Sequence, residues 1–161
     1  PLFTLDAELT LVSARGQRSV PIAAYFTGYK KDVRQPGELI SRISWKAPPA
    51  RTSNLFYKLA RRKGDAITVV GVAVGLSVDR GRCTRARVAL GAVAPTVLRA
   101  REAEAMLEGQ ALTPALIEAA AKAAASTARP IDDIRASATY RHHGVHVLVR
   151  RLIGQAWERL A

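Results

Sequence analysis

Residues 67–91 decide the fold: ITVVGVAVGLSV (Ile67–Val78), DRGR (Asp79–Arg82) and CTRARVALG (Cys83–Gly91). The first stretch is apolar and rich in β-branched residues, and the last alternates in polarity, so each is typical of a β-strand. The Asp-Arg-Gly-Arg segment between them has the composition of a tight turn. The stretch therefore predicts an antiparallel β-hairpin.

Upstream of this hairpin, short apolar runs alternate with polar or Pro-rich segments. We predict strands at residues 9–12, 19–22, 39–45 and 55–62, and loops at residues 26–36 and 47–54. The first two strands surround Arg15-Gly16-Gln17 and form a second hairpin.

Downstream of the hairpin the chain is rich in Ala and Leu at helical spacing, which predicts helices at residues 95–107, 114–126 and 134–160. Thr113 precedes Pro114 as a suitable N-cap, and Gly109 is placed to end the first helix. Strands followed by helices indicate an α+β fold, in which a helical bundle covers one face of an antiparallel sheet.

The chain is strongly basic, with 25 Lys and Arg against 13 Asp and Glu and a formal net charge of +12. Such a charge fits nucleic acid, an acidic partner or the phosphates of a nucleotide cofactor, and equally a solvated surface. The densest cluster is Lys58, Arg61, Arg62 and Lys63. It is typical either of an edge strand protected by charge or of an anion contact.

Neither a membrane span nor a disulfide is predicted. No apolar run approaches the roughly 20 residues that cross a bilayer. The single cysteine, Cys83, excludes an internal disulfide and a multi-cysteine metal site, and we interpret it as a buried structural thiol. It is compatible with the reducing cytoplasm, where we expect the protein to lie.

The histidines at residues 142–146 (HHGVH) are the strongest candidate for a metal site. His142 and His146 are four residues apart, so both can reach one ion from a helix. No glutamate general base lies between them and no third ligand is evident. We therefore interpret them as surface or interface residues and expect no metal site.

Other candidate features also favour structural roles. No Ser/His/Asp arrangement or carboxylate pair stands out, so no catalytic residue is expected. Gly71 and Gly75 form no phosphate-binding motif and indicate a bulge or close packing under a helix. Asp132-Asp133 is interpreted as helix N-terminal charge ahead of Ile134.

Several segments occur in a characteristic order: FTGYKK (26–31), PGELI (36–40), YKLARRKGD (57–65), VAV (72–74), LGAVAP (90–95), Arg99 with Glu104-Ala105, and DIRASATYR (133–141). Together they resemble the flavoprotein (medium) subunits of the molybdenum hydroxylase family, the class of xanthine dehydrogenase and aerobic carbon monoxide dehydrogenase. The resemblance extends over essentially the whole chain.

The resemblance implies a domain organisation. Residues 55–161 would form a CO dehydrogenase flavoprotein C-terminal-like domain, in which about three antiparallel strands pack against a three-helix bundle. Residues 1–24 would be a hairpin remnant of the preceding FAD-binding domain, and residues 25–54 a connecting loop and strand. The glycine-rich loops that hold the FAD diphosphate are absent from this sequence, so we expect this chain alone not to retain FAD.

The resemblance also implies two cofactor-binding residues. Lys58 matches a lysine placed to meet the flavin or its anionic part, and Ile40 matches an aliphatic residue that packs on the isoalloxazine. Lys30 stands where the family usually has arginine, and a lysine ammonium does not form the bidentate contacts of a guanidinium.

The implied function is electron transfer. Molybdopterin in a large subunit and 2Fe-2S clusters in a small subunit would deliver electrons to FAD in this subunit, and this chain would close over the flavin and dock both partners. Exposed strand edges in the hairpin predict pairing into a homodimer. The rival interpretation is a non-enzymatic basic binding module for nucleic acid or an acidic protein; few aromatic residues and no stacking platform argue against nucleic acid.

Overall fold

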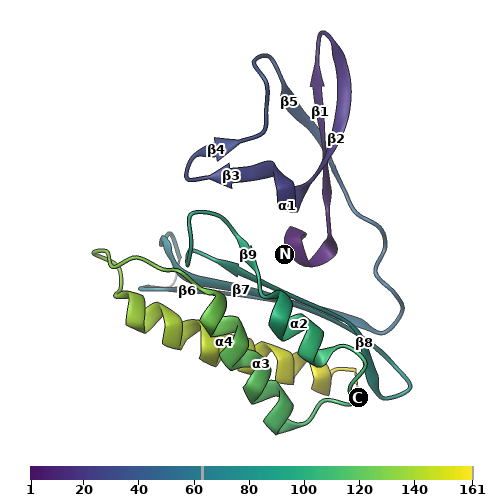
Figure 1. Ribbon diagram of the computed structural model, residues 1–161, viewed down its shortest axis with the longest axis vertical. Coiled ribbons are helices and arrows are strands. Elements are labelled where there is room, and N and C mark those ends of the chain that lie inside the picture. The colour runs from purple at the N-terminus through teal and green to yellow at the C-terminus, as the bar shows by residue number, and fades with distance from the viewer. Residues whose placement is uncertain (63, 161) are drawn as a thin grey trace.

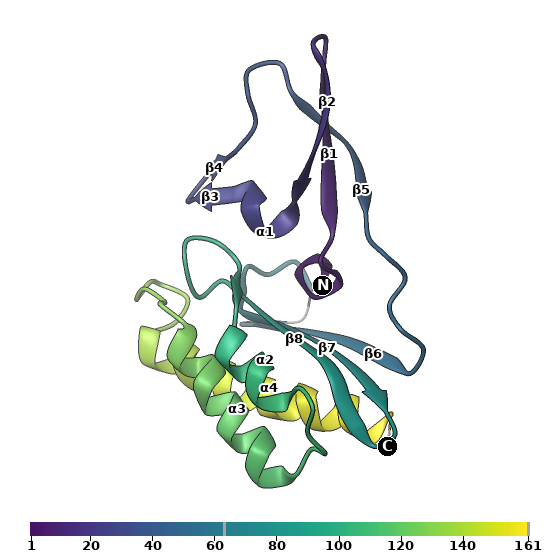
Figure 2. The ribbon, with the colours of Figure 1, turned by 45° about the vertical axis from the view of Figure 1, so that its right-hand side comes forward.

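A four-stranded antiparallel sheet divides the computed structural model, which describes residues 1–62 and 64–160, into two parts (Figure 1). One face of this sheet is covered by helices α2 (Arg101–Leu107), α3 (Pro114–Thr127) and α4 (Ala138–Glu158). The N-terminal residues lie on the opposite face (Figure 2). The α+β class predicted from the sequence is confirmed.

The strands of this sheet follow the order β6 (Thr52–Ala60), β7 (Thr68–Asp79), β8 (Arg82–Gly91) and β9 (Leu98–Arg99). The hairpin expected at residues 67–91 is β7–β8, and Gly81 adopts a φ of 72° in its turn. β7 is central and buried over most of its length, because helices cover one face and N-terminal residues cover the other.

Helix α4 packs closely on the sheet at Gly144. A Cβ added there would lie 3.3 Å from Val70 Cγ2 and 3.5 Å from Leu59 Cδ2. Glycine lowers the helix propensity at this position, but a Cβ there would press on the Val70 side chain of β7, which would have to shift. The position therefore serves helix–sheet contact.

The N-terminal elements form a smaller unit. They are the 3₁₀ helix η1 (Leu2–Leu5), β1 (Glu8–Ser13), β2 (Gly16–Pro21), α1 (Ile22–Tyr25), β3 (Phe26–Gly28), β4 (Lys31–Asp32) and β5 (Leu39–Ser44). The predicted β1–β2 hairpin and the strand β5 belong to one sheet with the order β2-β1-β5. Its core contains Leu9, Leu11 and Tyr25, and extends to Ala73 and Ala89 on the four-stranded sheet.

Several boundaries differ from the sequence expectations. The polar segment 26–36 contains the short pair β3–β4, and β9 occupies part of the expected first helix, which begins only at Arg101. The last helix begins at Ala138 rather than at residue 134. Ser137 is its N-cap and accepts a hydrogen bond from the Tyr140 backbone N–H, so the residues before it form a loop.

None of the described helices is long and apolar enough to span a membrane.

Candidate functional site

Lys58 lies on the face of the four-stranded sheet that carries the N-terminal unit. Asn54, Phe56 and Lys58 alternate along β6 and so share one face, and the Asn54 Oδ1 atom contacts Thr4 Oγ1 of η1 at 3.0 Å. Lys58 is exposed and has no ion pair among the residues that the structure describes. Its ammonium group is therefore available to an anionic ligand.

An aromatic side chain accompanies this cation. Phe56 is 52% exposed, and Gly71, which pairs with Lys58 across the sheet, lies beside the Phe56 ring. A Cβ at Gly71 would lie 3.7 Å from Phe56 Cε2. A free cation and a half-exposed aromatic ring thus lie together on one sheet face, which is a suitable surface for a flat, anionic cofactor.

Ile40 lies on the other sheet. It pairs with Leu11 of β1 and is 43% exposed beside the buried core of the N-terminal unit. The structure therefore places Lys58 and Ile40 on different units. Only the family resemblance groups these two residues.

The basic cluster next to Lys58 is not a continuous strand. β6 ends at Ala60, and Arg61 and Arg62 follow it as exposed residues that donate to the carbonyls of Ile134 and Asp65. The strand expected at residues 55–62 therefore ends two residues earlier than predicted. Lys63 lies outside the described residues.

Gly75 packs under the 3₁₀ helix η1, which agrees with the close packing under a helix that the sequence suggested. A Cβ added to Gly75 would lie 3.4 Å from Thr4 Cβ and 3.6 Å from the Thr4 carbonyl oxygen. η1 therefore lies directly on β7 at this position.

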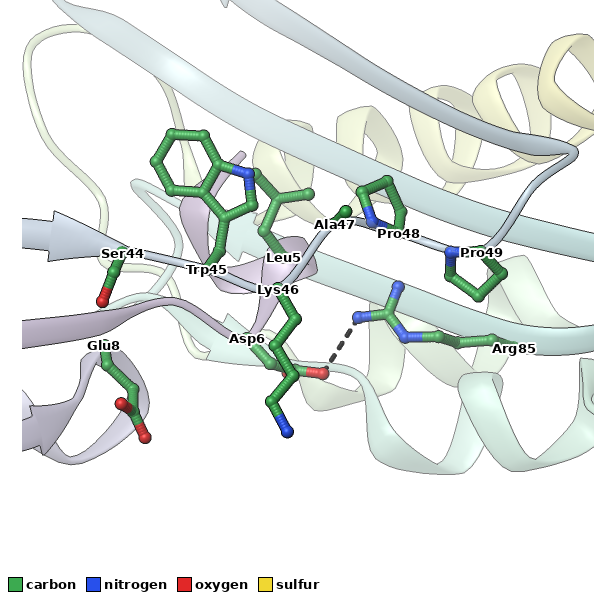
Figure 3. A pocket seen from close by; sticks show the side chains of 10 residues that line it. All are labelled: Leu5, Asp6, Glu8, Ser44, Trp45, Lys46, Ala47, Pro48, Pro49 and Arg85. Atoms are coloured by element: carbon green, nitrogen blue, oxygen red, sulfur yellow. Dashed lines mark hydrogen bonds and ion pairs between the residues drawn. The ribbon is translucent and has the colours of Figure 1, made fainter.

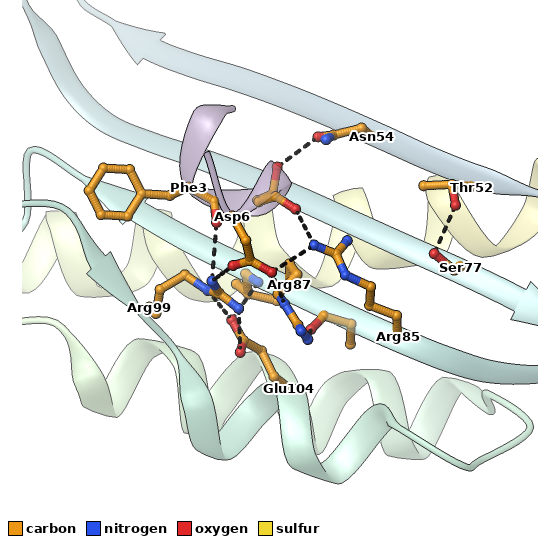
Figure 4. A network of polar contacts seen from close by, with 12 residues as sticks. Phe3, Asp6, Thr52, Asn54, Ser77, Arg85, Arg87, Arg99 and Glu104 are labelled. Carbon is orange, nitrogen blue, oxygen red and sulfur yellow. Dashed lines mark hydrogen bonds and ion pairs between the residues drawn. The ribbon is translucent and has the colours of Figure 1, made fainter. Parts of the chain in front are cut away.

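Asp6 joins the two units through three arginines, and sequence reasoning missed this cluster (Figure 4). Its carboxylate accepts from Arg85 Nη2 at 2.9 Å, from Arg87 Nε at 3.0 Å and from Arg99 Nη1 at 2.8 Å. We call these four residues the Asp6 cluster. Partial burial opposes ionisation of Asp6, but the arginine hydrogen bonds outweigh it and lower the pKa of Asp6 to about 2.

The Asp6 cluster continues into the helical layer. Glu104 of α2 is 4% exposed and forms a two-point ion pair with Arg99, at 2.6 Å and 2.8 Å. Glu104 also accepts from the Val88 backbone N–H at 2.8 Å. The arginines further donate to the carbonyls of Phe3 and Thr4. The cluster therefore fixes η1, β8 and α2 relative to one another.

Two of the three histidines of residues 142–146 contact α3. His146 Nε2 lies 2.9 Å from Glu118 Oε1, and His142 Nδ1 lies 3.1 Å from the Ala125 carbonyl oxygen. The described residues contain no group of three or more His, Cys, Asp or Glu side chains that could hold a metal ion.

Cys83 is buried at the start of β8, and burial raises the pKa of its thiol to about 11. This environment matches the structural thiol expected from the sequence.

The two aspartates ahead of α4 have separate roles. Asp132 Oδ1 accepts from the Ala138 backbone N–H at 2.6 Å, so it does act at the helix N-terminus. Asp133 instead accepts from the backbone N–H groups of Arg135 and Ala136 and from Arg141. The backbone hydrogen bond from Arg135, together with the other donors, holds the pKa of Asp133 well below its ordinary value.

A cavity of about 620 Å³ lies between η1, Arg85 and the segment after β5 (Figure 3). Trp45, Lys46 and Pro49 form one side of it, and the Asp6–Arg85 ion pair forms part of the other. Neither Lys58 nor Ile40 lines this cavity, so it is separate from the predicted cofactor-binding residues.

The comparisons with known proteins agree with this geometry. The model of the CO dehydrogenase flavoprotein C-terminal domain matches residues 55–156. The chain belongs to this family. The FAD binding domain in molybdopterin dehydrogenase matches residues 1–45, so this member of the flavoprotein C-terminal family also carries residues of the preceding domain.

Curated relatives are similar to this chain over almost all of its length. The carbon monoxide dehydrogenase medium chain of Hydrogenophaga pseudoflava is 32% identical over 99% of this chain and 55% of its own length. The putative xanthine dehydrogenase FAD-binding subunit of Escherichia coli is 28% identical over 97% of this chain and 54% of its own.

A solved structure of carbon monoxide dehydrogenase from Hydrogenophaga pseudoflava superposes with a TM-score of 0.93 at 34% identity, over 99% of this chain and 55% of that one. The chain thus spans about half the length of the relatives it matches. The family resemblance is confirmed, and none of the comparisons supports the rival nucleic-acid module.

Proposed function

We propose that this chain is the part of an FAD-containing electron-transfer subunit of a molybdenum hydroxylase that closes over the flavin. The observation that carries the proposal is the Lys58 ammonium, which has no ion pair among the described residues. It lies beside Phe56 and Gly71, on the sheet face that carries residues of a FAD-binding domain. FAD, when bound, supplies the electron-transfer chemistry.

The residues of this chain fit a flavin in specific ways. Lys58 would place a fixed positive charge beside the cofactor, which stabilises negative charge on it. Phe56 would cover an aromatic face, and Ile40 would pack on the isoalloxazine from the N-terminal unit. The Asp6 cluster would hold the two units in a constant relation, so that these contacts stay aligned.

We also propose how the chain divides into domains and which subunits it assembles with. Residues 1–24 would end the FAD-binding domain, residues 25–54 would connect, and residues 55–161 would form the C-terminal domain. Relatives are named medium chains and subunits, which supports assembly with a molybdenum-binding large subunit and a 2Fe-2S small subunit. The same proposal locates the protein in the cytoplasm. Nothing in the comparisons supports a homodimer through the hairpin.

The test is a substitution of Lys58 in the complete subunit. Lys58→Ala should weaken FAD binding about tenfold and lower the flavin reduction potential, because a cation beside the reduced cofactor is lost. Lys58→Arg should retain most of both properties. Lys122→Ala, on the exposed side of α3, is the matched control. Unchanged affinity and potential in Lys58→Ala would refute the assignment.

A further inference from the structure

The connection between α3 and α4 presents large apolar side chains to solvent. Ile134 is 90% exposed, Ile131 is 72% exposed and Tyr140, in the first turn of α4, is 51% exposed. Resting on the proposed function, we propose that these residues, together with Arg61 and Arg62, dock on a partner subunit whose surface is apolar and rimmed by carboxylates. We call this set the Ile134 surface.

The loop that carries Ile134 is held in one conformation by its own hydrogen bonds. Asp133 Oδ1 accepts from the backbone N–H groups of Arg135 at 2.8 Å and Ala136 at 3.2 Å. Asp133 and Ala136 also form a backbone bridge. Ile134 lies inside this turn, so its backbone is fixed while its side chain points outward.

Arg141 extends this support to the sheet. Its side chain is buried and donates to Asp133 Oδ1 at 2.8 Å, to the Val69 carbonyl at 3.0 Å and to the Ala92 carbonyl at 2.7 Å. The loop is therefore anchored to the core on its inner side. A rigid apolar anchor loses little conformational entropy on association, which is a property of strong interface residues.

A hollow of about 270 Å³ lies next to the exposed side chains. It is lined by Leu59 of β6 and Arg61 just after this strand, and by Arg135 and Tyr140 near the start of α4. Arg61 Nη1 also donates to the Ile134 carbonyl at 3.2 Å, which places the two loops side by side. A protruding apolar side chain beside a hollow can fit a protein surface of complementary shape.

The charges around the Ile134 surface favour an acidic partner. Arg61 and Arg62 donate only to backbone carbonyls and have no ion pair among the described residues. Asp133, in contrast, is paired with both Arg135 and Arg141. The net charge of +12 opposes pairing with a second copy of the chain. A partner subunit with carboxylates around an apolar patch would match both the exposed apolar side chains and the two arginines.

The experiment uses the complete subunit and its partner subunits. Ile131→Ser with Ile134→Ser should weaken assembly at least about tenfold, measured by titration and by co-elution, because the apolar anchors are lost. Arg61→Glu should weaken it as well, and salt should weaken the unsubstituted complex. Ile134→Val and Arg80→Glu are the controls; Arg80 lies in the β7–β8 turn, at the other end of β7, and its side chain is 93% exposed.

FAD content and thermal unfolding of each variant are measured separately, so failure of the proposed flavin role is distinguishable from failure of docking. The replaced isoleucines lie outside the core, so folding should be unaffected. Assembly that is unchanged in the Ile131/Ile134 double variant would overturn the proposal. A change in self-association of the subunit alone, without a change in assembly, would assign the surface to a second copy and overturn it as well.

Discussion

Arg99 Nη1 of β9 donates to Asp6 Oδ1 of the N-terminal unit at 2.8 Å, although the two residues are 93 positions apart in the chain. Both residues also contact further charged groups, Arg85 and Arg87 on one side and Glu104 on the other. This pair is the centre of the contact between the FAD-binding-domain residues and the C-terminal domain. Substitution of either residue should therefore weaken the contact between the two units and lower the stability of the chain.

Asp6→Asn should destabilise the chain by about 1–2 kcal/mol, because three charge-assisted hydrogen bonds weaken while half of the carboxylate is already solvated. Urea unfolding measures the change. Glu8→Gln, on the exposed side of β1, should change stability by less than about 0.5 kcal/mol. Equal effects of the two substitutions would contradict a special role for Asp6.

Stability should also depend on acid through Asp6. Its folded pKa is about 2, below the value of about 4 expected for an unfolded aspartate. A lowered pKa contributes stability that is complete above the unfolded value and is lost as the pH falls toward the folded one. The urea concentration at the unfolding midpoint should therefore decrease as the pH is lowered from 4 to 2. The decrease should be less steep in Asp6→Asn. Parallel curves would argue against this linkage.

Arg141→Lys should cost about 2–3 kcal/mol, because one ammonium cannot replace the guanidinium contacts with Asp133, Val69 and Ala92. Hydrogen exchange should increase in residues 131–137 as the loop loses its inner support. Arg129→Lys, at an exposed arginine, is the control. Unchanged exchange in the loop would show that Asp133 alone orders it.

Cys83 should react slowly with thiol reagents in the folded chain. Burial raises its pKa to about 11, so almost no thiolate is present at pH 8. Labelling in denaturant should be more than about tenfold faster. The chain contains one cysteine, so the rate reports this site directly. Rapid labelling of the native chain would indicate that the start of β8 opens.

The isolated chain should not retain FAD. Lys58, Phe56 and Ile40 offer single contacts, and they do not replace the glycine-rich loops that the family resemblance implies for the FAD diphosphate. The purified chain should be colourless and should give no tight complex in calorimetry, whereas the complete subunit should bind. A yellow preparation with stoichiometric flavin would require a binding site other than the one proposed.

The sequence alone predicted the elements that have a clear local signature. The β7–β8 hairpin follows from its apolar strands and Gly81, and α3 follows from Thr113 and Pro114, where Thr113 Oγ1 accepts from the Leu116 backbone N–H. The family also followed from the order of its motifs. The short strands β3, β4 and β9 were not predicted, because two or three residues are too few to show the alternation of apolar and polar residues typical of a strand.

Only the tertiary structure decided which charged residues meet. Nothing in the sequence distinguishes Asp6 from other acidic residues, because its arginine partners become neighbours only when η1 packs across β7 and β8. The same holds for Arg141, whose buried contacts come from a loop, β7 and the turn after β8. Local patterns set the strands and helices, whereas ion pairs depend on distances that arise when these elements pack.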